Sequence, residues 1–355
     1  MKEIVNKLFL EEKTDNFKKE ISDSLFNKYG LFPQNHITFL LEEELEFVDK
    51  NNRIEEVIIL YDFIKWLKKE EIPYWLRGAA GSSLLFYILG ITRGNPLPAH
   101  SFCPKCKSMD WLDHDYYSGF DVKEDLRCKK DGYLLLTDGH NIPWESFWSY
   151  EGNEIVFTID LPIDSYQKIK GFWESYQAEI LKEDILVIRK EFKGLRFLNI
   201  DCIFTIEKVN QDFYKTNLDI VEAIKNFDLG DLPKPHNFSD LLHGLGLKFS
   251  TGAWTDKTKF MIENLGMNLS DMVAFREDVF FFISGKFAYM EDAWLETRNF
   301  NKGKKSWRDI GEINLAVDKW KLAIIEDILY LFPKAHCMEY LIFSIKNKYG
   351  GIKDV

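Results

Sequence analysis

The chain has 355 residues, 46% of them hydrophobic and 15% aromatic, which is enough for about two or three domains' worth of core. Its net charge of −11 argues against a surface dedicated to duplex DNA, because basic groups that neutralise phosphates supply most non-specific affinity. No apolar run reaches the roughly 18 residues that span a membrane, and the N-terminus lacks a signal-peptide core, so we expect a cytoplasmic protein.

The N-terminal part is expected to be helical. Apolar residues recur at helical spacing between charges over residues 1–30, 36–48 and 53–70. These stretches predict packing or partner helices, with one or two of them in the first stretch. The acid-rich segment LEEELEF, residues 41–47, is interpreted as a solvated face of its helix.

A loop of small residues, RGAAGSS over 77–83, follows a short apolar segment and precedes another predicted helix. Small residues let backbone N–H groups approach a ligand closely. A helix that begins at such a loop directs its free N–H groups towards the same point, so the pattern indicates a phosphate site. It matches neither the nucleotide P-loop nor GxGxxG, and a tight packing turn is the alternative interpretation.

Residues 101–139 are expected to form an inserted module with a metal site. Cys103 and Cys106 form a CxxC pair, and Cys128 begins a second half that reads CKKD. Three thiolates and a fourth donor can form a tetrahedral zinc site, in which Asp131 takes the place of the last cysteine. Three histidines are alternative fourth ligands: His100, His114 and His140. A finger that has lost its metal and keeps three free thiols is the other interpretation.

Two predicted strands further along the chain contain acidic residues. The strand VFTIDL contains Thr158 and Asp160, and side chains two apart in a strand share a face. A strand over 195–207 contains Asp201 between apolar residues. A charge in that setting needs compensation, which favours a functional site over a surface position.

These segments together resemble the palm and part of the fingers of PolC-type DNA polymerase III alpha subunits, which are bacterial C-family replicative polymerases. The resemblance covers about residues 24–355 and rests on four stretches: RGAAGSSLLFYILGITRGNPLPAH, CPKC, DGHNIPWESFWSYEGNEIVFTIDLPID and FPKAHCMEY. It implies an α+β fold, with a polymerase-beta-like nucleotidyltransferase palm, a mixed sheet, an inserted zinc-finger-like module and a helical fingers remnant. Flanking domains of the family are not recognisable in the sequence.

The resemblance also implies a division of the chain and a set of site residues. The expected regions are 1–72, helical and leading into the palm; 73–207, palm-like, with the zinc-finger-like insertion 101–139; and 208–355, helical and fingers-like. The implied nucleotide-binding residues are Arg77, Gly78, Gly81, Ser82, Ser83, Lys334 and His336. The implied metal and catalytic positions are Asp160, Asp201 and Thr158 for magnesium, and Cys103, Cys106, Cys128 and Asp131 for zinc.

One departure from the family pattern leaves the activity open. Family members oppose two magnesium ions with three aspartates, whereas Thr158 is neutral and stands at one of those positions. The chain is therefore expected to be either a nucleotidyltransferase with reduced or lost polymerase activity, or an inactive palm that binds nucleotide or a protein partner. Glu154 or Asp164 could complete an active metal site instead. Nucleotide is the expected ligand, nucleic acid a weak one, and a membrane is not expected.

Overall fold

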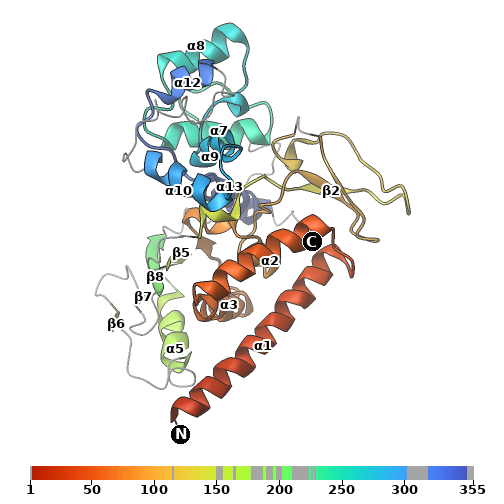
Figure 1. Cartoon of the computed structure of the whole chain (residues 1–355), viewed down its shortest axis with the longest axis vertical. Coiled ribbons are helices and arrows are strands. Elements are labelled where there is room, and N and C mark those ends of the chain that lie inside the picture. Colours follow the sequence, from red (N-terminus) through yellow and green to blue (C-terminus); the bar gives the residue numbers. More distant parts are fainter. Residues whose placement is uncertain are drawn as a thin grey trace.

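We describe the fold from a computed structural model of the chain. The structure describes residues 2–113, 116–148, 155–162, 165–176, 187–188, 195–196, 202–209, 224, 227, 229–301 and 319–349. Within these ranges the chain is a mixed fold of helices and two small sheets (Figure 1). No described helix is both long and apolar enough to cross a lipid bilayer.

Three helices form the N-terminal part: α1 (Lys2–Tyr29), α2 (Asn35–Lys50) and α3 (Ile54–Lys69). Their bounds closely match the predicted stretches, and α1 is one continuous helix. On α2 the residues Ile37, Leu41 and Val48 are buried, as the helical period of the apolar residues requires. Figure 1 shows α1 as the long diagonal helix beside α2 and α3.

A five-stranded sheet holds the segment that was predicted to carry the acidic residues. Its strands follow the order β1-β5-β8-β7-β6. Their bounds are β1 (Trp75–Leu76), β5 (Ile155–Pro162), β6 (Val187–Ile188), β7 (Leu195–Arg196) and β8 (Cys202–Val209). Strand β5 pairs antiparallel with β1 and parallel with β8, and a parallel pair needs a crossover connection. Part of that connection is α5 (Tyr166–Tyr176).

A second, three-stranded sheet belongs to the inserted module. Its order is β3-β2-β4, and both pairings are antiparallel. The bounds are β2 (His100–Phe102), β3 (Met109–Trp111) and β4 (Leu136–Asp138), with a short 3-10 turn η2 (Gly119–Asp121) between β3 and β4. The module stands out to one side of the helices in Figure 1.

The described residues from 229 on lie mostly in helices. Its elements are α7 (Phe238–Phe249), α8 (Asp256–Leu265), η7 (Leu269–Asp271), α9 (Arg276–Ser284), α10 (Met290–Asn301), α12 (Lys319–Ile325) and α13 (Lys334–Tyr349). Side chains Asn237 and Thr255 accept hydrogen bonds at the N-termini of α7 and α8, which explains where these helices begin.

Two buried apolar clusters make up most of the described core. The first joins α1, α2, α3, α4 (Leu84–Ile88), β5 and α5, and includes Trp148 and Trp173. The second joins α7, α9, α12 and α13, and includes Phe238 and Met338. The loop over residues 77–83 lies where the two clusters meet, because it follows β1 and packs against α13.

Candidate functional site

The small-residue loop begins beside the middle of β5. After β1 the chain forms a 3-10 helix, η1 (Gly78–Ser82), and then the short helix α4 (Leu84–Ile88). The backbone N–H of Arg77 donates to the carbonyl oxygen of Thr158 at 2.8 Å, which extends the β1–β5 pairing. The segment that was predicted to bind phosphate therefore lies against the strand that contains Thr158.

Helix α13 closes the other side of this loop. The backbone N–H of Gly78 donates to Nδ1 of His336 at 3.1 Å. A Cβ atom at position 81 would lie 2.5 Å from Cγ of Glu339 and 3.2 Å from the carbonyl oxygen of Ala335, so only glycine allows this approach. Three segments far apart in the sequence, 77–83, 155–162 and 334–339, thus meet at one place.

Lys334 and His336, both in the FPKAH segment, have different surroundings. Burial, followed by the charge of Arg77, lowers the pKa of His336 to about 4, so its imidazole is neutral at pH 7 and accepts the Gly78 hydrogen bond. Lys334 is buried, and burial lowers its pKa even though Asp278 and Glu277 favour the charged form. His336 therefore contacts the loop directly, whereas the Lys334 ammonium faces the carbonyl oxygen of Asn141 at 3.5 Å.

A buried glutamate from α2 holds the far end of the loop. Glu44 is fully buried and accepts from the Ser83 hydroxyl at 2.5 Å, from the Trp148 indole N–H at 2.6 Å and from the Leu85 N–H at 3.0 Å. Burial raises its pKa, and these hydrogen bonds partly oppose that rise. The interpretation of 41–47 as a solvated face was therefore wrong at Glu44, which lies one helical turn from the buried Leu41 on the apolar stripe.

The loop is open to solvent only at its first residues. Ser82 and Ser83 are fully buried, and the Ser82 hydroxyl donates to the carbonyl oxygen of Trp144 at 3.4 Å. Arg77, Gly78 and Ala79 are partly exposed. Gly78 has a positive φ of 80° and no atom within 4 Å of the position a Cβ would take. A ligand that reaches the loop from solvent meets residues 77–79 first.

The predicted carboxylates are only partly located. Strand pairing places Asp160 beside Trp75 on one side and Glu207 on the other, and it places Thr158 beside Thr205. Asp201, Glu154 and Asp164 lie outside the described residues. Glu207 was not considered from the sequence, because its position beside Asp160 depends on the register of β8.

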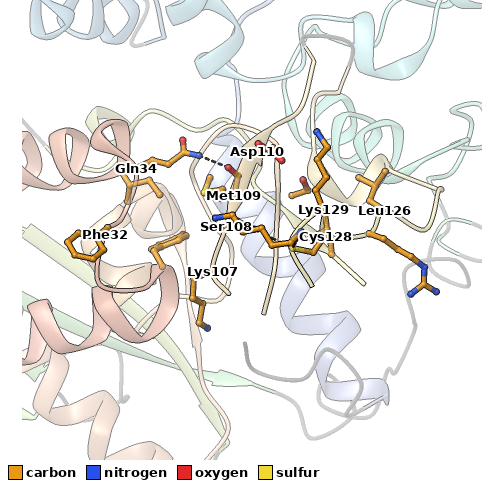
Figure 2. A pocket seen from close by; sticks show the side chains of 15 residues that line it. Phe32, Gln34, Lys107, Ser108, Met109, Asp110, Leu126, Cys128 and Lys129 are labelled. Carbon is orange, nitrogen blue, oxygen red and sulfur yellow. Dashed lines mark hydrogen bonds between the residues drawn. The ribbon is translucent and has the colours of Figure 1, made fainter. Parts of the chain in front are cut away.

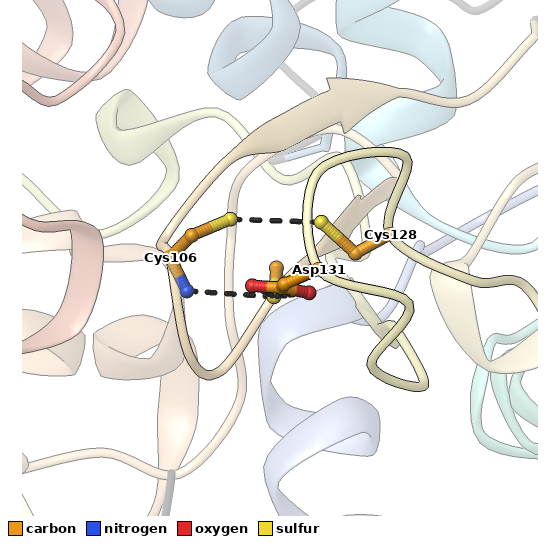
Figure 3. Close-up of side chains that lie close together, drawn as sticks. Cys106, Cys128 and Asp131 are labelled. Atoms are coloured by element: carbon orange, nitrogen blue, oxygen red, sulfur yellow. Dashed lines mark hydrogen bonds between the residues drawn. The ribbon is translucent and has the colours of Figure 1, made fainter.

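The predicted metal ligands of the inserted module come together. The ligand atoms of Cys103, Cys106, Cys128 and Asp131 all lie within 4.8 Å of one another. The Cys106 and Cys128 sulfurs are 3.6 Å apart, and the Cys103 sulfur is 3.5 Å from both Asp131 oxygens. Figure 3 shows Cys106, Cys128 and Asp131 pointing towards one another from two loops.

The two loops that carry these ligands have the same backbone hydrogen bonds. In the first, Cys103 N–H donates to Ser108 O at 2.8 Å, and Lys107 N–H donates to Cys103 O at 2.9 Å. In the second, Cys128 N–H donates to Tyr133 O at 2.8 Å, and the N–H of residue 132 donates to Cys128 O at 2.9 Å. The residues after the CxxC and CxxD segments, Lys107 and Gly132, both have positive φ. Asp131 therefore occupies the position that matches Cys106.

This geometry fits a tetrahedral metal ion. With a zinc–sulfur distance of about 2.3 Å, ligand atoms at tetrahedral angles lie about 3.5 to 3.8 Å apart, close to the separations found here. A hydrogen bond with Ser108 is the main cause that lowers the pKa of Cys106 and favours its thiolate. The alternative ligands His100 and His140 are engaged elsewhere, with Pro98 O and the Ser118 hydroxyl respectively, and His114 lies outside the described residues.

Comparison with known proteins finds sequence similarity to bacterial DNA polymerase III. A sequence model described as the bacterial DNA polymerase III alpha NTPase domain matches residues 15–180. The chain is similar to the PolC-type DNA polymerase III of Thermotoga petrophila, with 22% identity over 87% of this chain and 32% of that protein. The chain is a distant relative of the PolC-type DNA polymerase III alpha subunit.

Two further PolC-type polymerases show the extent of the likeness. The protein of Mycoplasmopsis pulmonis is 21% identical over 96% of this chain and 33% of its own length. That of Lacticaseibacillus paracasei is 32% identical over a shorter part, 44% of this chain and 11% of its own length. The chain spans about a third of the length of the first two PolC-type relatives.

Proposed function

We propose that this PolC relative is a diverged nucleotidyltransferase-fold palm that binds a nucleotide and a divalent metal ion, with polymerase activity reduced or lost. The observation that carries the proposal is the position of Arg77 and Gly78 between Thr158 of β5 and His336 of α13. The polymerase-beta-like palm, its division into residues 1–72, 73–207 and 208–355, and the helical fingers remnant belong to the same proposal.

The nucleotide phosphates would meet the exposed beginning of the loop. The Arg77 guanidinium lies 5.4 Å from the centre of the Trp75 ring and is partly exposed, so it can offer charge-assisted hydrogen bonds. Gly78 leaves open space for close approach. Because Glu44 accepts from Ser83 and Leu85, the buried end of the loop supports its shape rather than the ligand. Phosphate contact is therefore assigned to residues 77–79.

A divalent metal would depend on the acidic residues of β5 and β8. Carboxylate oxygens are the ligands that Mg²⁺ prefers, and the proposal assigns Asp160 and Asp201 to it, with Glu207 as a further candidate through its register beside Asp160. When bound, the ion would neutralise phosphate charge at the site. Thr158 contributes a neutral oxygen, so the site has one anionic ligand fewer than the family pattern.

Equilibrium binding of dATP in the presence of Mg²⁺ tests the nucleotide site. We expect Arg77→Ala to weaken binding at least tenfold, since a charge-assisted contact contributes about 1.5 to 3 kcal/mol. The matched control is Lys18→Ala, an exposed cation on α1, which should leave the affinity unchanged. Equal affinities of the Arg77 variant and the unmodified protein would remove residues 77–79 from the site.

Restoring the missing carboxylate tests the metal site. We expect Thr158→Asp to raise the affinity for Mg²⁺ in the presence of dATP, because hard cations depend on charged oxygens. Ser22→Asp, at an exposed position on α1, is the control for added charge alone. An Mg²⁺ affinity that Thr158→Asp leaves unchanged would contradict the assignment of Thr158 to the metal site.

An inactive palm is the second candidate function, and Thr158 together with the internal use of Ser83 by Glu44 favours it. In that case the site would bind nucleotide or a protein partner without transfer chemistry. We expect templated primer extension to be at least roughly three orders of magnitude slower than that of an intact relative, since each ~1.4 kcal/mol is tenfold in rate. Robust extension by the unmodified protein would overturn the inactive-palm candidate and favour an active polymerase.

A further inference from the structure

A groove of about 560 Å³ lies between the turn that joins α1 to α2 and the two metal-ligand loops of the inserted module. Its apolar floor includes Ile37, Met109 and Leu135. Figure 2 shows Phe32 on one side of the groove and Lys129 on the other. The groove is separate from the loop over residues 77–83, none of which lines it.

Positive charge is concentrated at this groove in a chain whose net charge is −11. Four cations line it: Lys107, Arg127, Lys129 and Lys130. Among the described residues, none of the four forms an ion pair with a carboxylate, and the only carboxylate in the lining is that of Asp110. Lys129 and Lys130 are exposed, so their charges are available to a polyanion.

An aromatic side chain stands at the rim next to these cations. Phe32 is 93% exposed, and the neighbouring Leu31 is 73% exposed. The turn that carries them is fixed to the module, because the Gln34 side-chain amide donates to Met109 O at 2.7 Å. A Cβ atom added at Gly30 would lie 3.0 Å from Cβ of Lys107, so the turn runs close to the module. The turn that carries the ring is therefore fixed, and within the described chain nothing covers the ring.

We propose that this groove binds a single strand of nucleic acid, with phosphates on the cations and a base stacked on Phe32. Proteins that bind single strands combine a basic groove with exposed aromatic side chains, because every base has a face that can stack. An acidic peptide would use the cations but would gain nothing from an exposed ring. The proposal goes beyond the nucleotide site and does not depend on it.

The position of the cations in the sequence couples this groove to the metal-ligand loops. Lys107 directly follows Cys106, and Lys129 and Lys130 lie between Cys128 and Asp131. The backbone N–H of Lys130 donates to the Cys128 sulfur at 3.4 Å. Three of the four cations are thus carried by the loops that a metal ion would fix, so metal-loaded protein should bind a strand more tightly than chelator-treated protein.

Fluorescence anisotropy with a labelled 12-nucleotide oligo-dT tests the proposal on the full chain. We expect the double variant Lys129→Glu, Lys130→Glu to bind at least tenfold more weakly and with a smaller dependence on salt, because fewer phosphates are then neutralised and fewer counterions are released. Lys129→Gln with Lys130→Gln should show a smaller loss in the same direction. The control with the same charge change is Lys18→Glu, Lys19→Glu on α1, where both lysines are exposed.

Two other variants separate the parts of the proposal. Phe32→Ala should weaken binding several-fold with no change in the salt dependence, because it removes stacking and no charge. Arg77→Ala should leave oligo-dT binding unchanged, so failure at the nucleotide site and failure at the groove are distinguishable. Equal oligo-dT affinities for the Lys129, Lys130 glutamate variant and its control would overturn the proposal. Tighter binding of a 12-residue polyglutamate than of oligo-dT would also overturn it, in favour of an acidic peptide.

Discussion

Replacing Glu44 by glutamine tests whether an internal carboxylate shapes the small-residue loop. In the structure one carboxylate oxygen accepts from Ser83 and Trp148, and the other accepts from Leu85 N–H. A glutamine side chain of the same shape has a single carbonyl oxygen, so it keeps the first two contacts and turns its NH₂ group towards the third donor. The Leu85 N–H is then buried and left facing another N–H.

The expected loss of stability follows from these contacts. A buried donor without an acceptor costs about 1 to 3 kcal/mol, and the two remaining bonds lose their charge-assisted part. Removing a desolvated carboxylate, whose pKa is already raised by burial, offsets part of this cost. We therefore expect Glu44→Gln to lower the free energy of unfolding by about 2 to 3 kcal/mol. Glu44→Ala leaves all three donors without an acceptor, with an expected loss of about 4 to 6 kcal/mol.

Urea unfolding followed by tryptophan fluorescence measures this loss, and Trp148, which donates to Glu44, is one of the ten tryptophans that contribute to the signal. Two core clusters need not unfold together, so the comparison is made on the first transition. Glu46→Gln is the matched control, since Glu46 lies on the same helix, is 65% exposed and forms an exposed ion pair with Lys50. If both glutamine variants shift the midpoint equally, Glu44 does not hold the loop.

Three further predictions concern the metal-ligand loops, a close approach and a buried acid. Protein purified without chelator should contain about one equivalent of zinc by elemental analysis. The Asp131→Cys variant should retain zinc against a chelator at least tenfold more strongly than the unmodified protein. A zinc content below about a tenth of an equivalent in the unmodified protein would refute the site. Gly81→Ala should lower the unfolding free energy by about 1 to 3 kcal/mol in urea through its clash with α13, whereas Gly171→Ala, with no atom within 4 Å, should not destabilise the protein. Burial, together with nearby carboxylates, raises the pKa of Glu145 to about 7. The folded state then binds more protons than the unfolded state between about pH 4.5 and 7, so stability should fall by up to about 3 kcal/mol as pH rises through that range, and a Glu145→Gln variant that keeps the same fall would contradict this.

The sequence predicted the helices and the metal-ligand loops well because their signals are local. Apolar residues three or four apart define α2 and α3 within the chain segment itself. The CPKC and CKKD segments carry their own backbone turns, with positive φ at Lys107 and Gly132, so the ligands converge once the two loops face each other. The fourth ligand could not be chosen from spacing alone, because three histidines were equally compatible.

The sequence could not predict contacts that depend on segments far apart. The Glu44 carboxylate meets Ser83 39 residues away, and the Gly78 N–H meets His336 258 residues away. Neither distance leaves a periodic signal. The position of Asp160 beside Glu207 likewise depends on the register of a parallel strand pair, which no short motif encodes. Within the small-residue loop over 77–83, the structure has a 3-10 helix at Gly78–Ser82.

The contact between Gly78 and His336 also has a consequence for the order in which parts of the chain can fold during synthesis. Synthesis proceeds from the N-terminus, and core regions tend to fold as they emerge. The first core cluster uses residues between Phe17 and Tyr176, so it can assemble before α13 has left the ribosome. The contacts between the loop over 77–83 and α13 form later, because Glu339 and His336 are translated more than 250 residues after the loop. Ligand binding at this loop would thus report that translation has passed α13.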